Sequence, residues 1–256
     1  MKTKLLNSVL FSIIVSSVAA AGTVPLAECE ANVERAALRM DGALLSAQTS
    51  QIDQGVAAAP NDPALRYFRA FAYYAEGCVA RTQKDAKKVI ERFETAVKEL
   101  EAIKDPSWED EAAGFQGYIL NQLIGPKGGA SAMSLGPKSS ALIGKALRRA
   151  PGSPRVMFFQ GVVLVMTPEM FGGDLDGGIK LLERADAAFE KQPEEALIHW
   201  GHAEALAWLG IAKQKHGDVV GARKAWEHAL AIEPEYGWVK YVLLPSLNRT
   251  SEKSKK

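Results

Sequence analysis

The feature of the sequence that most limits its fold is the regular spacing of five prolines. Pro60, Pro106, Pro151, Pro193 and Pro234 are separated by 46, 45, 42 and 41 residues. Each proline follows a stretch with helical periodicity, and alternating strand patterns are nearly absent between them. A period of this length is typical of stacked helical repeats, in which each unit buries its apolar face against the next. The chain is therefore expected to be all-α.

The best-formed unit is AEALAWLGIAKQKHGDVVGARKAWEHALAIEP, which runs from Ala203 to Pro234. Small residues stand where the two helices of this unit would cross closely: Gly210, Ala222 and Ala229. Gly217 can adopt the positive φ that ends a first helix, and Asp218 follows it at the start of the second helix. The pattern predicts a helical hairpin with a tight turn.

This unit resembles a tetratricopeptide repeat (TPR). The matching positions are Leu206, Leu209, Gly210, Gly217, Asp218, Ala222, Trp226, Ala229 and Pro234. Lys213 departs from the pattern, because the family often has tyrosine there. The chain is also similar to exported bacterial TPR proteins with an FGGD-type turn, which stands here at Phe171-Gly172-Gly173-Asp174. The resemblance implies an α-solenoid, and proteins with this repeat mostly bind proteins or peptides.

Stretched copies of the same pattern predict about five TPR-like hairpins over residues 22–248, followed by a C-terminal capping helix in YGWVKYVLLPSL. Residues beyond the family's repeat length of about 34 are expected to form inserted loops. These insertions are VARTQKDAK in the second unit, GPKGGASAMSLGPKS in the third and TPEMF in the fourth. We expect the tryptophans near the end to pack the last repeat against the capping helix: Trp200, Trp208, Trp226 and Trp238.

Residues 1–21 have the layout of a secretory signal peptide. Lys2 and Lys4 precede an apolar run, and Ala19-Ala20-Ala21 offers a small-residue cleavage site. Cleavage would remove two lysines from a net charge of +1 and leave the mature chain near −1. We therefore expect a periplasmic or secreted protein, with no membrane insertion after cleavage. No basic stripe points to nucleic acid, and residues 249–256 are expected to form a disordered tail.

The glycine-rich turn of the fourth unit suggests a phosphate loop or a calcium loop, and it lacks the residues that either requires. A phosphate loop ends in Gly-Lys-Ser/Thr, which GGDLDGGIK lacks, and Pro137 interrupts the nearest match in the third unit. A calcium loop that began at Asp174 would need glutamate twelve positions along, where Ala185 stands. We expect Asp174 to cap the following helix, and Ser139 or Ser140 to cap the second helix of the third unit.

All four histidines lie between His199 and His228. His199 and His202 are three residues apart, so a metal site on one helix face, and a metal-dependent enzyme built on it, is one alternative. The simpler interpretation is that these histidines lie on the surface or cap helices. No catalytic set stands out, so we assign no catalytic residue, metal or cofactor and expect a non-catalytic binding protein.

An exported chain with two cysteines raises the question of a disulfide. Cys29 lies near the start of the first helix of unit one, and Cys78 lies past the end of the first helix of unit two. In parallel neighbours these ends would be roughly 20 Å apart, whereas a bridge needs Cα atoms within about 7 Å. A regular array therefore predicts two free thiols.

The first helices of such an array line its concave surface. Aligning Ala70, Gly117, Gly161 and Gly210 as equivalent points predicts which side chains face inward. The predicted groove consists of Tyr67, Phe71, Tyr74, Tyr118, Asn121, Phe158, Val162 and Ile211, with loop 125–138 at its edge. An aromatic groove open to solvent would be a recognition surface, whereas a covered one would be ordinary core. Both interpretations remain open.

The sequence therefore favours an exported TPR-like scaffold that binds a peptide, a protein or a small apolar ligand on its concave surface. An accessory subunit of a cell-envelope transport or assembly complex is an alternative, and the enzyme that would use His199 and His202 is another.

Overall fold

The computed structural model describes residues 25–247, and every regular element in that range is helical, as predicted. The first half contains α1 (Leu26–Arg39), α2 (Gly42–Ala58), α3 (Pro63–Thr82), α4 (Ala86–Ala102) and α5 (Glu109–Lys127). The second half contains α6 (Ala132–Arg149), α7 (Pro154–Met166), α8 (Leu175–Phe189), α9 (His202–His216) and α10 (Val219–Ile232). The predicted signal peptide and tail lie outside the described residues.

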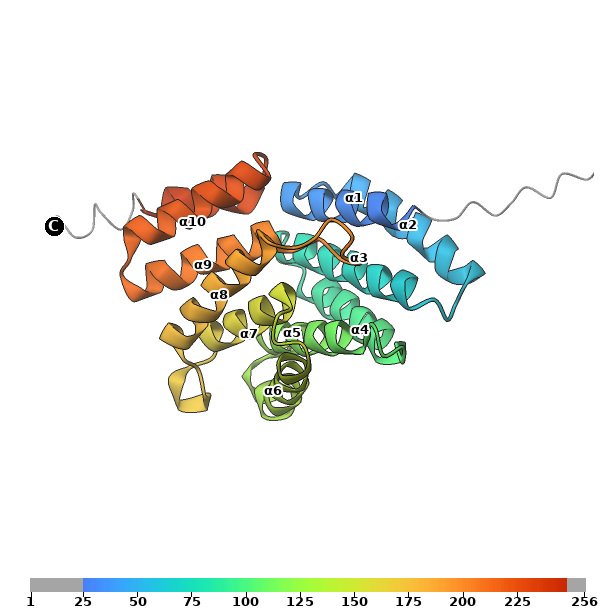
Figure 1. The fold of residues 1–256 in the computed structure, drawn as a ribbon, viewed down its shortest axis with the longest axis horizontal. Coiled ribbons are helices and arrows are strands. Elements are labelled where there is room, and N and C mark those ends of the chain that lie inside the picture. The colour runs from blue at the N-terminus through green and yellow to red at the C-terminus, as the bar shows by residue number, and fades with distance from the viewer. Residues whose placement is uncertain (1–24, 248–256) are drawn as a thin grey trace, which may run out of the picture.

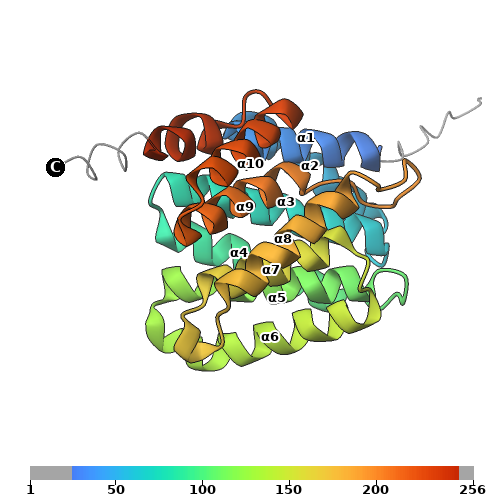
Figure 2. The ribbon, with the colours of Figure 1, turned by 60° about the vertical axis from the view of Figure 1, so that its left-hand side comes forward.

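The helices pair in the order of the chain (Figures 1 and 2). Helix α1 packs on α2, α3 on α4, α5 on α6, α7 on α8 and α9 on α10. Adjacent pairs also contact each other, through α2 with α3, α4 with α5 and α8 with α9. The apolar faces thus form one continuous core along the chain, which is the hairpin arrangement that the proline spacing predicted.

Aspartates begin most of the second helices of these pairs. Asp41, Asp85, Asp174 and Asp218 each accept a hydrogen bond from a backbone N–H in the first turn of α2, α4, α8 and α10. A side-chain acceptor at this position satisfies one of the unpaired amides that every helix start leaves. The predicted capping role of Asp174 is confirmed. Helix α6 is the exception, because Ser131 makes no side-chain cap.

The insertion in the third unit is helical, so the predicted loop at 125–138 is wrong. Helix α5 continues through Pro126 to Lys127, and after a 3-10 turn α6 already begins at Ala132. Pro137 lies inside α6, where it costs one backbone hydrogen bond, and burial of Ile143 and Ala146 offsets that cost. Ser139 is therefore buried in the middle of α6, and neither Ser139 nor Ser140 caps a helix.

The insertions in the second and fourth units, which were expected to form loops, do not form long loops either. In the second unit, α3 simply continues to Thr82, and a short turn leads to α4. In the fourth unit, Glu169–Phe171 forms a 3-10 turn. Gly173 then passes so close to the chain that a Cβ there would lie 1.8 Å from the Thr167 carbonyl oxygen. Only glycine fits this turn without moving the backbone.

The two ends of the helical array meet. After α10 the chain is helical again over 237–247, with a π-helical segment at Val239–Leu243, so the predicted C-terminal helix is present. The Arg39 guanidinium at the end of α1 bonds both carboxylate oxygens of Glu233, at 3.1 and 3.2 Å. Figure 1 shows α1 and α10 at the two sides of this junction. The first and last hairpins therefore close around a shared interior.

Within residues 25–247, no helix combines the length and the apolar character that crossing a bilayer would require.

Candidate functional site

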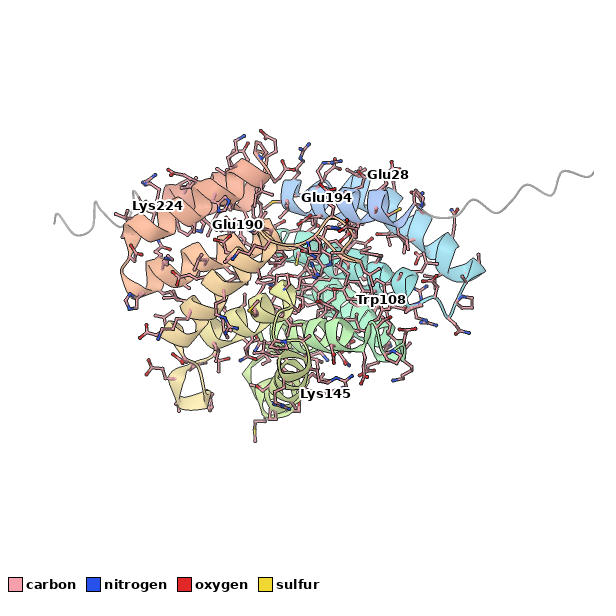
Figure 3. The ribbon with its side chains drawn as sticks, viewed as in Figure 1. Glu28, Trp108, Lys145, Glu190, Glu194 and Lys224 are labelled. Atoms are coloured by element: carbon pink, nitrogen blue, oxygen red, sulfur yellow. The ribbon has the colours of Figure 1, made fainter. Side chains whose placement is uncertain are left out.

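The connection between α8 and α9 crosses the inner surface of the array, which we define as the face of the first helices that carries Phe71, Phe115 and Phe159. This connection, residues 190–201, extends toward α1 and returns to α9 (Figure 1). In Figure 3, Glu190 marks the point where it leaves α8, and Glu194 lies farther along it. The connection brings the indole of Trp200 into the middle of the inner surface.

Trp200 is enclosed by aromatic rings from three first helices. Its ring stacks on Phe71 of α3 with centroids 4.1 Å apart, and it lies 5.0 Å from Phe115 of α5 and 6.0 Å from Phe159 of α7. Its exposed fraction is 1%. The prediction that Trp200 packs the last repeat against the C-terminal helix is wrong, because the α8–α9 connection carries it away from that helix.

Trp208 and Trp238 pack the last hairpin against the C-terminal segment as predicted, whereas Trp226 packs within the last hairpin. Trp208 of α9 meets Trp238 of the C-terminal segment edge to face, with ring centroids 5.6 Å apart. Trp226 of α10 donates its indole N–H to the Ala207 carbonyl of α9 at 2.9 Å. A Cβ on Gly210 would lie 2.1 Å from the Trp226 ring, which explains the small residue at this position of the repeat.

Acidic residues of α1 hold the backbone of the buried connection. Glu30 accepts hydrogen bonds from the backbone N–H groups of His199, at 2.5 Å, and Trp200, at 3.0 Å. Glu34 accepts the N–H of Gly201 at 2.8 Å, and the buried Arg155 guanidinium donates to the Trp200 carbonyl at 3.4 Å. Buried backbone groups need such partners, so these contacts allow an irregular segment to lie inside the molecule.

Most of the predicted groove is consequently closed. Tyr67, Phe71, Tyr74, Tyr118, Phe158 and Val162 are each at most 3% exposed, whereas Asn121 and Ile211 are half-buried. The structure brings three of these residues, Phe71, Tyr74 and Tyr118, to the wall of a cavity that is partly open to solvent. Tyr67, Asn121, Phe158, Val162 and Ile211 do not line it.

The cavity has a volume of about 480 Å³ and lies where the first and last hairpins meet. Helices α1, α3 and α9 form most of its wall, and the segment after α10 closes one side. Its aromatic lining consists of Phe71, Tyr74, Tyr118, Trp200, Trp208, Tyr236 and Trp238. This volume and this mainly apolar lining are typical of a site for a small molecule.

Two carboxylates also face the cavity, Glu204 from α9 and Glu34 from α1. The Tyr74 hydroxyl donates to Glu204 at 2.7 Å, and the Tyr118 hydroxyl donates at 3.2 Å. Burial raises the pKa of Glu204 above its ordinary value, and the two tyrosine hydrogen bonds partly oppose that increase. Burial therefore disfavours the charged form of Glu204, and the hydrogen bonds from Tyr74 and Tyr118 favour that form.

The pKa of the second carboxylate, Glu34, is also raised. Burial raises its pKa from 4.5 to about 7, and the Gly201 N–H opposes the increase. The charges of Glu30 and Glu204 raise it further, whereas Arg155 lowers it. Glu34 thus changes its charge close to neutral pH while facing the cavity.

The Glu34→Gln variant is expected to be more stable than the wild type at pH 8 and nearly equal to it at pH 5. The folded chain holds a proton on Glu34 that the unfolded chain releases near pH 4.5, so this stabilisation is present at low pH and lost as the pH rises through about 7. The difference should be about 1–3 kcal/mol at pH 8. Urea unfolding at both pH values measures it, with the exposed Glu28→Gln as control. An equal offset at both pH values would contradict the prediction.

Both cysteines are free thiols, Cys29 in the core under α1 and Cys78 in the cavity wall. Burial raises the pKa of Cys78 to about 12, and Arg81 only partly opposes this.

We expect Cys78 to react slowly with iodoacetamide at pH 8, about 50-fold more slowly than an exposed thiol. Its thiolate fraction is lowered about a thousandfold, and the greater nucleophilicity of a basic thiolate recovers part of the rate. Mass spectrometry of a Cys29→Ala chain measures the rate. The control is Gln83→Cys in a chain without other cysteines, because Gln83 is exposed at the end of α3. Equal rates at the two positions would show that Cys78 is not buried in this way.

The structure does not bring His199 and His202 together at one site. The His199 ring lies 3.1 Å from the Glu194 carbonyl oxygen, whereas His202 lies 2.7 Å from an Asp186 oxygen of α8. His202 also stacks on Phe189. Gly201, with φ +109°, begins α9 between the two histidines, so they do not share one helix face. Among the described residues, the group with metal-ligand spacing is Asp186, Glu190 and His228.

Comparison with solved structures finds a likeness to the HusA haemophore from Porphyromonas gingivalis, with a TM-score of 0.53 and 19% sequence identity. The match covers 73% of this chain and 94% of that chain. At this identity the likeness concerns the all-helical fold. No family model matches the chain, so this comparison leaves its resemblance to TPR proteins unconfirmed. No curated protein sequence matches it either.

Sequence reasoning missed Glu34, Glu204 and Trp200 as parts of one site. A signal was present in two of them, because Glu34 and Glu204 stand three and four residues before apolar residues of their helices, Ala37 and Leu38 in one and Ala207 and Trp208 in the other. A charged residue in such a position is uncommon unless it has a partner or a function. Trp200 gave no comparable signal, since its position depends on the path of the connection.

Proposed function

We propose that this chain is an exported binding protein that holds a small, mainly apolar ligand in the cavity between α1, α3, α9 and the C-terminal segment. The observation that carries the proposal is the aromatic cavity of about 480 Å³ at the junction of the two ends. A partly open pocket of this volume with a mainly apolar lining can bury most of the surface of a small ligand. The signal-peptide pattern of residues 1–21 supports export.

This ligand site lies in a different place from the one expected for an α-solenoid scaffold. A peptide groove along the first helices has little room, because Trp200 and the connection cover Phe71 and Phe159. A ligand at the junction of the first and last hairpins would instead bridge the two ends of the array. Binding would then favour the closed arrangement in which Arg39 meets Glu233.

The fold likeness to a haemophore supports a small-molecule role and makes haem a specific candidate. Haem iron is held in proteins by His, Cys, Met or Tyr. The lining includes Met40, Cys78 and Tyr74, whereas none of the four histidines is part of it. Haem also carries two carboxylates, which would meet Glu34 and Glu204 in the same cavity. A neutral or cationic apolar molecule therefore fits the wall better.

A fluorescence titration with the neutral dye N-phenyl-1-naphthylamine tests the site. The dye should bind the mature protein with enhanced emission. Ala37 is a small, half-buried residue of α1 in the cavity wall, so Ala37→Trp should fill part of the space and weaken binding at least about tenfold. Val220 lies on α10, is 67% exposed and does not line the cavity, so Val220→Trp is the matched control.

Unchanged dye affinity in Ala37→Trp, with circular dichroism showing intact helices, would mean that the dye binds elsewhere and would remove the support for this site. Absence of dye binding to the wild type would count equally against it.

A further inference from the structure

The charges that face the cavity are unbalanced. Glu34 and Glu204 face it from opposite ends of the chain, and burial, the charge of Glu30 and the charge of Glu204 raise the pKa of Glu34. Arg81 is the only lysine or arginine among the lining residues. Its guanidinium is exposed, donates to the Gln122 side chain at 2.9 Å and lies over the Phe93 ring. The charge of Arg81 lowers the pKa of Glu204, but burial raises that pKa by more.

The other charged groups near these carboxylates are already paired. Arg155 of α7 lowers the pKa of Glu34, but its guanidinium bonds Glu111 at 3.3 Å and the Trp200 carbonyl. Glu30 of α1 adds a further negative charge and is 3% exposed. The remaining titratable groups around the cavity are Tyr74, Cys78, Tyr118 and Tyr236, whose pKa values burial raises, so they stay neutral near pH 7.

The aromatic lining of the cavity also favours a positively charged ligand. The faces of tyrosine and tryptophan rings attract cations, and this attraction grows when both groups are removed from water. Trp200, Trp208 and Trp238 line the same space as Glu34 and Glu204. An ammonium group there would meet two carboxylates and several ring faces, whereas a carboxylate would meet repulsion.

We propose, on the premise that the cavity is a ligand site, that its ligand is a small aromatic or apolar molecule with a protonated amine, and that the amine is paired with Glu34 and Glu204. The ring system of the ligand would fill the aromatic wall. The amine would add positive charge beside the two carboxylates to that of Arg155 and Arg81.

Three indoles that differ only in the end of the side chain test this inference at pH 8, where Glu34 is ionised. They are tryptamine, which is cationic, 3-ethylindole, which is neutral, and indole-3-propionate, which is anionic. Each is titrated in competition with N-phenyl-1-naphthylamine. Tryptamine should compete at least about tenfold better than 3-ethylindole, which corresponds to about 1.4 kcal/mol, and indole-3-propionate should be the weakest.

Glu34→Gln and Glu204→Gln should each reduce the ratio of tryptamine to 3-ethylindole affinity several-fold, since glutamine keeps the hydrogen-bond acceptor and removes the charge. Glu28, on the outer side of α1 (Figure 3), is exposed, and Glu28→Gln should leave the ratio as in the wild type. Between pH 8 and pH 5.5 the wild-type ratio should also fall as Glu34 gains its proton, and in Glu34→Gln it should change less.

Different results would contradict the ligand site and the amine inference. If the dye binds in the cavity but tryptamine competes no better than indole-3-propionate, the amine inference is overturned and the ligand site stands. If the dye does not bind, or Ala37→Trp leaves its binding unchanged, the ligand site itself is overturned together with the inference.

Discussion

Trp200→Ala is expected to lower the free energy of unfolding by about 3–5 kcal/mol, the range for removing a large aromatic side chain from a packed core. The indole fills the space between three first helices, and its ring lies 4.1 Å from Phe71 and 5.0 Å from Phe115. Alanine would leave a void that these rigid helices cannot close. Urea unfolding followed by far-UV circular dichroism measures the change.

The matched control is Phe171→Ala, which also truncates an aromatic residue in a connection between helices. Phe171 is 73% exposed, so its loss should change the free energy of unfolding by less than about 0.5 kcal/mol. Should Trp200→Ala behave like this control, the connection 190–201 would not be packed on the inner surface in solution.

The helical hairpins could be predicted from sequence because their signals are local. Proline spacing, the small residues Gly117, Gly161 and Gly210, and aspartates at helix starts each act within one hairpin. A Cβ on Gly161 would lie 2.8 Å from Leu182, and one on Gly117 would lie 2.6 Å from Ile143. Close crossing of paired helices requires these glycines, so the pattern of small residues identifies the hairpins before any tertiary contact is known.

The length of the helices in the third unit was not predictable in the same way. Pro126 and Pro137 normally indicate breaks, and the glycines between them favour a loop. The chain tolerates both prolines within helix because α6 packs along α5 and buries Ile143 against Gly117. Tertiary packing therefore overrides the local signal at this point.

The candidate site depends on contacts between residues far apart in the sequence. Glu30 and Trp200 are 170 positions apart, and Arg39 and Glu233 are 194 apart. No repeat pattern carries information about such contacts, because they form only when the array curves enough for its ends to meet. Sequence alignment of the repeats therefore identified Phe71, Tyr74 and Tyr118 as inward-facing but left open what covers them.

Glu30→Ala is expected to destabilise the fold by about 2–6 kcal/mol, because it removes the acceptor of two buried backbone hydrogen bonds. Its carboxylate accepts the N–H groups of His199 and Trp200, and Glu30 itself is 3% exposed. Alanine would leave two backbone donors without a partner at a site that water reaches poorly, at about 1–3 kcal/mol for each. The connection would loosen, and Trp200 would lose the backbone hydrogen bond that helps to hold its indole between the first helices.

Glu30→Gln separates the hydrogen bonds from the charge. The glutamine carbonyl oxygen can accept the same two N–H groups, so this variant should retain most of the stability that alanine loses. Removing the Glu30 charge should also lower the pKa of Glu34, which that charge raises. Two measurements therefore decide the role of Glu30: unfolding in urea for both variants, and tryptophan fluorescence for the environment of Trp200. If alanine and glutamine destabilise the protein equally, the charge of Glu30 holds the connection and its hydrogen bonds do not.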